Sequence, residues 1–212
     1  MEELPYQLYH AEKWDELHEC ISTLGYMSRQ FTTNNIHEFI LYWRTLKQAD
    51  ASKYKISQAY IEQIMGSMAE KAEMAVMLQW AYWQMFRNDV IRLTNICISY
   101  LNDLDAAYEL VEFLIRMCDQ MADGDTSEER CSFHNLAGMI CIRKKEYIQA
   151  LKEYREGLSL AVHAYGEDDL KITSYLCNIA DVYHSIGESQ YPVDKNALEK
   201  AKLILEKVLK MR

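Results

Sequence analysis

One pattern occurs twice in this sequence, as HNLAGMI at residues 134–140 and as CNIADVY at residues 177–183. Each copy reads Asn, an aliphatic residue and Ala, then two variable residues and a large apolar residue. A second helical pattern with an early Ala follows each copy, at residues 147–154 and at residues 198–205. Repetition at this period is typical of a helical array, in which neighbouring units bury each other's apolar faces. Because such an array exposes a groove, we expect the protein to bind a partner rather than to catalyse a reaction.

Composition narrows the fold class. The 212 residues include only seven Gly and two Pro, and half of the residues are hydrophobic. So few chain-breaking residues leave little room for the turns of an all-β protein. The sequence therefore predicts an all-α protein.

Charge narrows the class of partner. The formal net charge is -9, whereas phosphate binding needs a basic surface, so we expect no nucleic-acid partner. Residues 102–129 hold nine Asp or Glu against one Arg, and the last eighteen residues are rich in lysine. We interpret both runs as solvated helix faces. A basic partner on the acidic run is the alternative.

The six cysteines form no Cys-x-x-Cys pair and have no His at ligand spacing, which is typical of buried thiols in a reducing compartment. No apolar run approaches the roughly 18 residues of a membrane span, so we expect no membrane insertion. The acidic start has no signal-peptide core. These features predict a cytoplasmic protein.

Apolar spacing predicts four helices before the repeats, at residues 4–24, 34–48, 52–65 and 68–86. Pro5 is tolerated in the first turn of the first helix, and Asn34 or Asn35 can cap the second. The fourth is apolar on most sides, and we interpret it as a buried helix rather than as a contact surface. No basic face accompanies it, so it is not a membrane-surface helix.

A third, degenerate copy of the pattern precedes the other two. Thr94 begins its apolar face, and Cys97, Ile98 and Leu101 follow at steps of three, one and three residues. The same steps recur in the two later copies. Turn signals separate the copies at residues 123–127 and 165–169. Gly187 stands where a first helix should end, and the insertion at 188–196, with Pro192, predicts a loop. The predicted domains are an N-terminal helical segment at 1–86 and three repeats, at 87–122, 128–163 and 169–212.

The small residues of these patterns resemble tetratricopeptide repeats, which are helical hairpins with small residues where the two helices touch. The Asn-Leu-Ala form and the Tyr-Gly-Glu-Asp-Asp connector at 165–169 are similar to the longer repeats of kinesin light chains and nephrocystins. The resemblance implies a right-handed α-α superhelix of such hairpins. It also implies a set of repeat-packing residues, namely Ile98, Ala137, Ala150, Ala180, Tyr183, Gly187 and Ala201.

In tetratricopeptide arrays the first helices line a concave groove that holds a peptide or helix of another protein. The resemblance carries this role to Arg92, Asn95, Ser99, Asn102, His134, Asn135, Asn178, Asp181 and His184. Cys141, Ser174 and Ser185 match groove positions as well. Asn135 and Asn178 stand beside the packing Ala residues, so they either hold the backbone between repeats or reach a peptide.

The N-terminal segment resembles the one that precedes the repeats in nephrocystin-like NACHT-type signalling ATPases. The matching residues are ELPYQL at 3–8, HA at 10–11 with Trp14 and Leu17, and YWR at 42–44. Those proteins carry a Gly-x-x-x-x-Gly-Lys loop for nucleotide, and no Gly-Lys pair exists here. We therefore interpret the chain as a short isoform or a fragment of a longer protein.

No arrangement of residues predicts catalysis or a cofactor. The six histidines form no His-x-x-x-His pair, and no Gly-x-Ser-x-Gly elbow exists. Cys141 and His134 lie two helical turns apart without an orienting third group. We therefore expect a non-catalytic scaffold without metal or cofactor that binds a protein or peptide partner. The alternative is a sensor region that restrains an ATPase domain outside this chain. Self-association is left open, and a ciliary site would follow from the nephrocystin resemblance alone.

Overall fold

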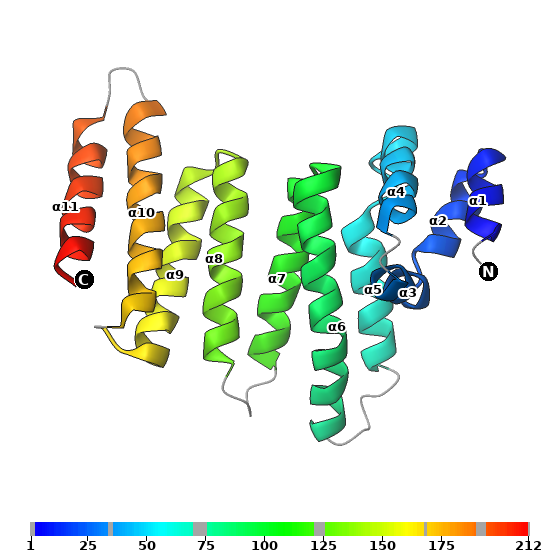
Figure 1. The fold of residues 1–212 in the computed structure, drawn as a ribbon, viewed down its shortest axis with the longest axis horizontal. Coiled ribbons are helices and arrows are strands. Elements are labelled where there is room, and N and C mark those ends of the chain that lie inside the picture. Colours follow the sequence, from blue (N-terminus) through cyan, green and yellow to red (C-terminus); the bar gives the residue numbers. More distant parts are fainter. Residues whose placement is uncertain are drawn as a thin grey trace. The chain divides into compact units, whose positions relative to one another are not determined.

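The computed structural model describes residues 3–33, 36–69, 76–120, 126–167, 169–189 and 194–211, without the side chains of 76–82. Within these ranges the chain is helical and has no strand, so the all-α prediction is confirmed. The chain forms two compact units, unit 1 at Met1–Leu110 and unit 2 at Val111–Arg212. The described helices are labelled in Figure 1.

Unit 1 is built from the helices that precede the two later copies of the repeat pattern. They are α1 (Glu3–His10), α2 (Trp14–Ile21), α3 (Leu24–Thr33), α4 (Ile36–Asp50), α5 (Ile56–Ala69), α6 (Val76–Ile96), the π-helical segment η1 (Cys97–Leu101) and the start of α7 (Leu104–Gln120).

The core of unit 1 is an aromatic cluster centred on α4. Phe39 and Trp43 are buried, and both rings pack against Tyr60 of α5, with centroids 6.2 and 5.8 Å away. The Tyr60 hydroxyl donates a hydrogen bond of 2.6 Å to the carbonyl of Ile21 in α2. Three helices are therefore joined by one buried side chain whose polar atom has a partner.

The predicted single helix at 4–24 is wrong, because two helices occupy that range. Glu12 has a φ of 55°, in the left-handed region, and the Lys13 amide donates to the carbonyl of Leu8 at 3.0 Å. A left-handed residue with such a bond ends α1, and α2 begins at Trp14. The pattern also did not indicate α3, although its buried Met27 and Phe31 are four residues apart.

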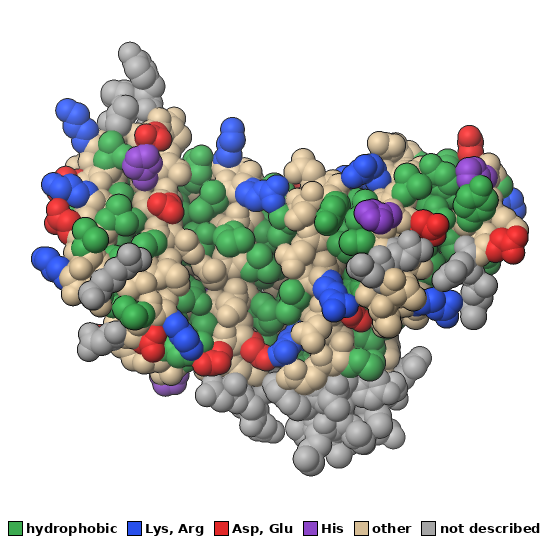
Figure 2. Space-filling model, in the orientation of Figure 1, with side chains coloured by type: hydrophobic (Ala, Val, Ile, Leu, Met, Phe, Trp, Pro, Cys, Tyr) green, Lys and Arg blue, Asp and Glu red, His purple; other side chains and the backbone are tan. Residues whose placement is uncertain are grey.

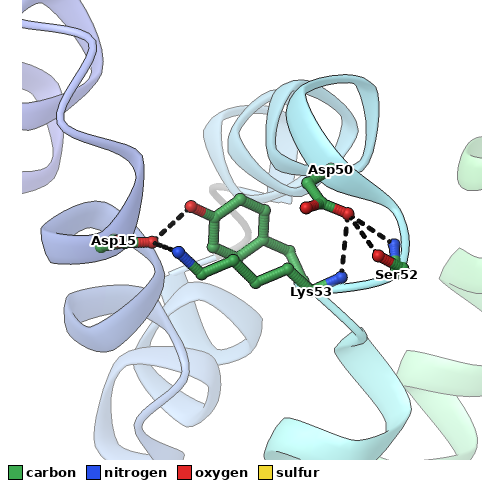
Figure 3. Close-up of polar contacts among 5 residues, drawn as sticks. Asp15, Asp50, Ser52 and Lys53 are labelled. Carbon is green, nitrogen blue, oxygen red and sulfur yellow. Dashed lines mark hydrogen bonds and ion pairs between the residues drawn. The ribbon is translucent and has the colours of Figure 1, made fainter.

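The helix predicted at 52–65 begins later, at Ile56, because the chain first makes a turn (Figure 3). The Asp50 carboxylate accepts hydrogen bonds from the amides of Ser52 and Lys53, at 2.9 and 3.1 Å. Beside this turn, Asp15 of α2 accepts bonds from the Lys53 ammonium and the Tyr54 hydroxyl. The bond from Lys53, followed by that from Tyr54, lowers the pKa of Asp15. The predicted caps Asn34 and Asn35 lie outside the described residues.

The helix predicted at 68–86 is wrong at both ends, because residues 68 and 69 belong to α5 and helix α6 begins at Val76. Helix α6 extends to Ile96, so the expected boundary between residues 86 and 87 lies inside it. Trp83 and Phe86 are buried, as a core helix requires, while Met85 is exposed. Residues 70–75 and the side chains of 76–82 lie outside the description.

The degenerate repeat pattern ends in a π-helical turn rather than in a regular helix. Thr94 and Cys97 are fully buried, but Ile98, predicted as a packing residue, is only partly buried. A π-helical turn contains more residues than an α-helical turn. Side chains beyond it therefore no longer follow the spacing of 3.6 residues per turn. Asn102 follows with a φ of 48°, and the Asp103 amide donates to the carbonyl of Cys97 at 2.9 Å.

Unit 2 contains two helical hairpins (Figure 1). Helix α8 (Ser127–Arg143) pairs with α9 (Tyr147–Tyr165), and α10 (Leu170–Ser189) pairs with α11 (Lys195–Met211). Helix α9 also packs against α10. Their shared core consists of Cys131, Ala161, Ile172, Tyr175, Leu176 and Val208.

The turn signals in unit 2 have mixed outcomes. Gly166 ends α9 with a φ of 88°, which its missing Cβ permits, so the predicted turn there is confirmed. Helix α10 continues past Gly187 to Ser189, so Gly187 does not end the helix. Residues 121–125, 168 and 190–193 lie outside the description, including Pro192. The right-handed superhelix and the division into three repeats stay predictions.

Candidate interaction face on helices α8 and α10

The two copies of the repeat pattern meet at their asparagines. The Asn178 amide on α10 donates a hydrogen bond of 2.7 Å to the Asn135 side-chain oxygen on α8. These residues occupy the same position in the two copies, 43 residues apart. Both side chains are half-buried. Helices α8 and α10 therefore lie side by side at this point, with equivalent residues of the two copies opposite each other.

Exposed side chains extend this contact along both helices. On α8, Ser132 and Met139 lie three and four residues from Asn135, on the same side of the helix, and both are exposed. On α10, the exposed residues around Asn178 are Ser174, Asp181 and His184. We call this set the interaction face: Ser132, Asn135 and Met139 with Ser174, Asn178, Asp181 and His184.

The structure places His134 outside the interaction face. Its Nδ1 lies 2.9 Å from the Glu153 carboxylate of α9, and both side chains are largely buried. The Gln149 amide donates to the same carboxylate at 2.6 Å. His134 is thus held between α8 and α9, because a buried carboxylate needs polar partners. The sequence pattern did not indicate Glu153, a charged residue at a buried position.

Cys141 is also buried, so it does not reach a ligand on this face. Burial, together with the negative charges of Glu153 and Glu146, raises the pKa of its thiol to about 12. The thiol stays protonated at neutral pH, whereas a nucleophilic cysteine needs its thiolate. The interpretation of Cys141 as a structural thiol agrees with this geometry.

The groove residues predicted from the degenerate copy lie in unit 1. Arg92, Asn95 and Ser99 are exposed on α6 and η1. Asn102 is exposed too, but its left-handed backbone gives it a structural role, since Asn adopts that conformation more readily than most residues. Burial raises the pKa of Asp89, and the nearby charge of Arg92 opposes this shift.

The small residues predicted to pack the repeats are buried. Ala137, Ala150, Ala180 and Ala201 are at most 4% exposed. A Cβ added to Gly187 would lie 2.6 Å from Leu198 of α11, so its missing side chain permits close approach of the two helices. Tyr183 is half-buried, and its hydroxyl accepts a hydrogen bond of 2.5 Å from Arg155 of α9.

Gly138 is a packing residue that the pattern treated as variable. A Cβ at this position would lie 2.6 Å from the Tyr154 ring, which is itself 1% exposed. The equivalent residue of the second copy is Asp181, which is exposed. Burial of Tyr154 raises the pKa of its hydroxyl, and the nearby charge of Asp181 raises it further. Tyr154 of α9 thus lies against α8 and close to α10.

A hollow of about 340 Å³ lies at one end of unit 2, between the α8–α9 turn and the end of α10. Lys145, Gln149, Ile186 and Ser189 are among the residues that line it.

The described residues contain no group of three His, Cys, Asp or Glu side chains placed to hold a metal ion. Among the helices described, none is long and apolar enough to cross a bilayer.

Comparisons with family models, with curated proteins and with solved structures found no match for this chain. The resemblance to tetratricopeptide repeats and to the segment before them in NACHT-type ATPases stays a prediction.

Proposed function

We propose that unit 2 is a non-catalytic protein-interaction module that holds a peptide of another protein against the interaction face. The Asn178–Asn135 hydrogen bond carries this proposal. It joins equivalent residues of two hairpins on a surface that is otherwise exposed. Both side chains are half-buried, so each amide keeps part of its polar surface accessible to a partner.

The amides suit a peptide backbone chemically. A side-chain amide has two N–H donors and a carbonyl with two lone pairs. The bond between Asn178 and Asn135 uses one donor and one lone pair, which leaves further donors and acceptors on both residues. An extended peptide offers alternating N–H and C=O groups that these amides can bind without regard to its side chains.

The neighbouring residues would supply selectivity. Met139 is 45% exposed on α8 and offers an adaptable apolar contact. Asp181 on α10 is exposed and offers an acidic side chain. The preferred peptide therefore has an apolar side chain near Met139 and a basic side chain near Asp181.

Selection from a library of unstructured peptides tests the proposal. Binding of the selected peptides should weaken about tenfold or more in Asn178→Ala, since a hydrogen bond to a desolvated amide contributes on the order of 1.4 kcal/mol. Lys152→Ala on the exposed side of α9 is the matched control and should leave the dissociation constant unchanged. Selected peptides that bind Asn178→Ala and the wild type equally would contradict the proposal.

A further inference from the structure

One tyrosine on α10 contacts cations from both neighbouring helices. The Tyr183 hydroxyl accepts a hydrogen bond of 2.5 Å from the Arg155 guanidinium of α9, at an exposed position. On α11, the Lys200 ammonium lies 5.4 Å from the centre of the Tyr183 ring. Arg155 and Lys200 are both exposed, while Tyr183 is half-buried. Three helices of unit 2 therefore bring three polar side chains to one place, which we call the Tyr183 cluster: Arg155, Tyr183 and Lys200.

Neither cation of the Tyr183 cluster is paired with a carboxylate. Figure 2 shows Lys and Arg side chains along the α11 edge of unit 2, with Asp and Glu side chains beside them. Individual contacts therefore decide which cations are paired. Glu199, the neighbour of Lys200, lies 3.8 Å from the Lys202 ammonium. Among the described residues, no carboxylate forms an ion pair with Arg155 or Lys200. Two like charges at one side chain repel each other, and an anion beside them removes this cost.

The Tyr183 cluster offers hydrogen-bond donors without acceptors for them. The Tyr183 oxygen accepts the bond from Arg155, and no described residue accepts the hydroxyl hydrogen of Tyr183. Arg and Lys side chains carry several N–H donors and no acceptor. The bond to Tyr183 uses one donor of Arg155, which leaves the others for a ligand. A ligand that fits this set is therefore negatively charged and rich in acceptors.

A phosphate monoester fits these donors better than a carboxylate does. It has three terminal oxygens and a charge of about −1.5 to −2 at neutral pH, so it can accept from all three residues and face both cations. A carboxylate has two oxygens and a single charge. The formal net charge of -9 argues against the phosphates of a nucleic acid. Because Arg155 and Lys200 are exposed, the ester oxygen of a bound phosphate can point to solvent, where the chain that carries it continues.

We propose that the Tyr183 cluster binds a phosphorylated side chain in a peptide of a partner protein. Arg155 donates its remaining N–H groups to the phosphate, Tyr183 donates its hydroxyl hydrogen, and Lys200 faces a further oxygen. The bond from Arg155 makes the Tyr183 hydroxyl a stronger donor, because linked hydrogen bonds polarise one another. The Tyr183 cluster shares no residue with the interaction face, so the inference goes beyond the proposed function.

Three short alanine-based peptides test this inference with the full chain. They carry phosphoserine, serine or glutamate at the same central position. NMR titration of the isotope-labelled protein measures their dissociation constants from the signals of Tyr183 and its neighbours. The phosphoserine peptide should bind at least about tenfold more tightly than either of the other two peptides.

Variants of the Tyr183 cluster locate the bound phosphate. Arg155→Gln should weaken binding of the phosphoserine peptide about tenfold or more. Lys200→Gln should weaken it about threefold or more, and it leaves the hydrogen bond between Arg155 and Tyr183 in place. Arg29→Gln is the matched control, because Arg29 is exposed on α3 in unit 1 and its replacement changes the net charge equally. Asn178→Ala should have no effect, which separates the Tyr183 cluster from the interaction face.

Four results would overturn the inference. The first is equal binding of the phosphoserine and serine peptides, or no binding of the phosphoserine peptide. The second is equal binding of the glutamate peptide, since the ligand would then be a carboxylate. The third is an equal response to Arg155→Gln and Arg29→Gln, which would assign binding to net charge alone. The fourth is displacement of the phosphoserine peptide by an equal concentration of inorganic phosphate, since the free ion would then be the ligand.

Discussion

At the scale of single residues, unit 2 depends on positions where a side chain has no room. Gly138→Ala would place a methyl group 2.6 Å from the Tyr154 ring, which is buried and has little space to move. Overpacking of this kind costs roughly 1–3 kcal/mol, more than the gain in helix propensity. We expect Gly138→Ala to lower the free energy of unfolding by about 1 kcal/mol or more.

Gly66→Ala is the matched control for this prediction. Gly66 lies in helix α5, and a Cβ there would have no heavy atom within 4 Å. Its replacement should stabilise the protein by roughly 0.5–1 kcal/mol, because Ala loses less entropy in a helix than Gly. Urea denaturation of both variants measures the two effects. Stabilisation by both substitutions would show that the Tyr154 ring can move aside at little cost in free energy.

The turn between α8 and α9 places a lysine where glycine is usual. Lys145 has a φ of 64°, and the next amide, of Glu146, donates to the carbonyl of Cys141 at 2.9 Å. A non-glycine residue in this conformation costs roughly 1–2 kcal/mol. We therefore expect Lys145→Gly to raise the free energy of unfolding by about 0.5–1 kcal/mol after the entropy cost of Gly.

Lys144→Gly tests the same turn one residue earlier. Lys144 has a φ of -77°, which any residue adopts, and its ammonium lies 3.0 Å from the Glu146 carboxylate. Gly at this position should destabilise the protein. Thermal melts of the two variants should therefore shift in opposite directions, and a shift in one direction for both would contradict this account of the turn.

Residue-level prediction from the sequence succeeded where size decides the position. Ala137, Ala150 and Ala180 were predicted as packing residues and are buried. It failed for His134, because a buried carboxylate, Glu153, holds the imidazole and no sequence periodicity indicates a charged core residue. Gly138 was missed because its requirement comes from Tyr154, on a different helix.

At the scale of helices, adjacent residues of α10 should separate packing from binding. Ala180 is 1% exposed, whereas Asp181 is exposed on the interaction face. Ala180→Leu must push neighbouring helices apart, at an overpacking cost of roughly 1–3 kcal/mol. Asp181→Ala should leave stability nearly unchanged and alter only binding of a partner.

Hydrogen exchange distinguishes the two variants along the chain. Because repeats are stabilised mainly by their neighbours, Ala180→Leu should increase exchange in α8–α11 before it does so in α1–α5. Asp181→Ala should leave the exchange pattern of the wild type. If Ala180→Leu had no effect and Asp181→Ala increased exchange in α10 and α11, the assigned register would be wrong and the groove residues would have to be discarded.

Helices were predictable wherever one apolar stripe was continuous, as in α4, α9 and α10. The single helix predicted at 4–24 failed at Glu12, since no Gly or Pro marks the left-handed residue that ends α1. The predicted start of α5 was too early, because the Asp50 carboxylate stabilises a turn before the helix. The spacing of apolar residues does not indicate such a turn. The π-turn at Cys97–Leu101 was not predicted either, because it departs from the α-helical period of 3.6 residues per turn.

At the scale of the whole molecule, the two units can be observed separately. All four tryptophans, at positions 14, 43, 80 and 83, belong to unit 1. Tryptophan fluorescence therefore reports on unit 1, whereas circular dichroism reports on the helices of both units. Chains built from more than one compact unit need not unfold in a single transition, so the two signals can differ.

His18 should make the stability of unit 1 depend on pH. Its ring lies edge-on to Trp43 and close to Tyr54, and burial lowers its pKa below the ordinary value of 6.5. The charge of Asp15 opposes this shift, and that of Lys53 adds to it. The folded state thus favours neutral His18, and its contribution to stability is fully present above pH 6.5. This contribution is lost as the pH falls through the lower pKa of the folded state.

We therefore expect the fluorescence-detected melting temperature to fall as the pH is lowered from about 7 to about 5. In His18→Phe, which keeps an aromatic ring beside Trp43 and Tyr54, the fall should be smaller. His37→Phe is the control, because His37 is exposed on α4 in the same unit and should leave the pH dependence of the wild type. An equal fall in all three proteins would assign the pH dependence to groups other than His18, and would show that the folded state tolerates its charged form.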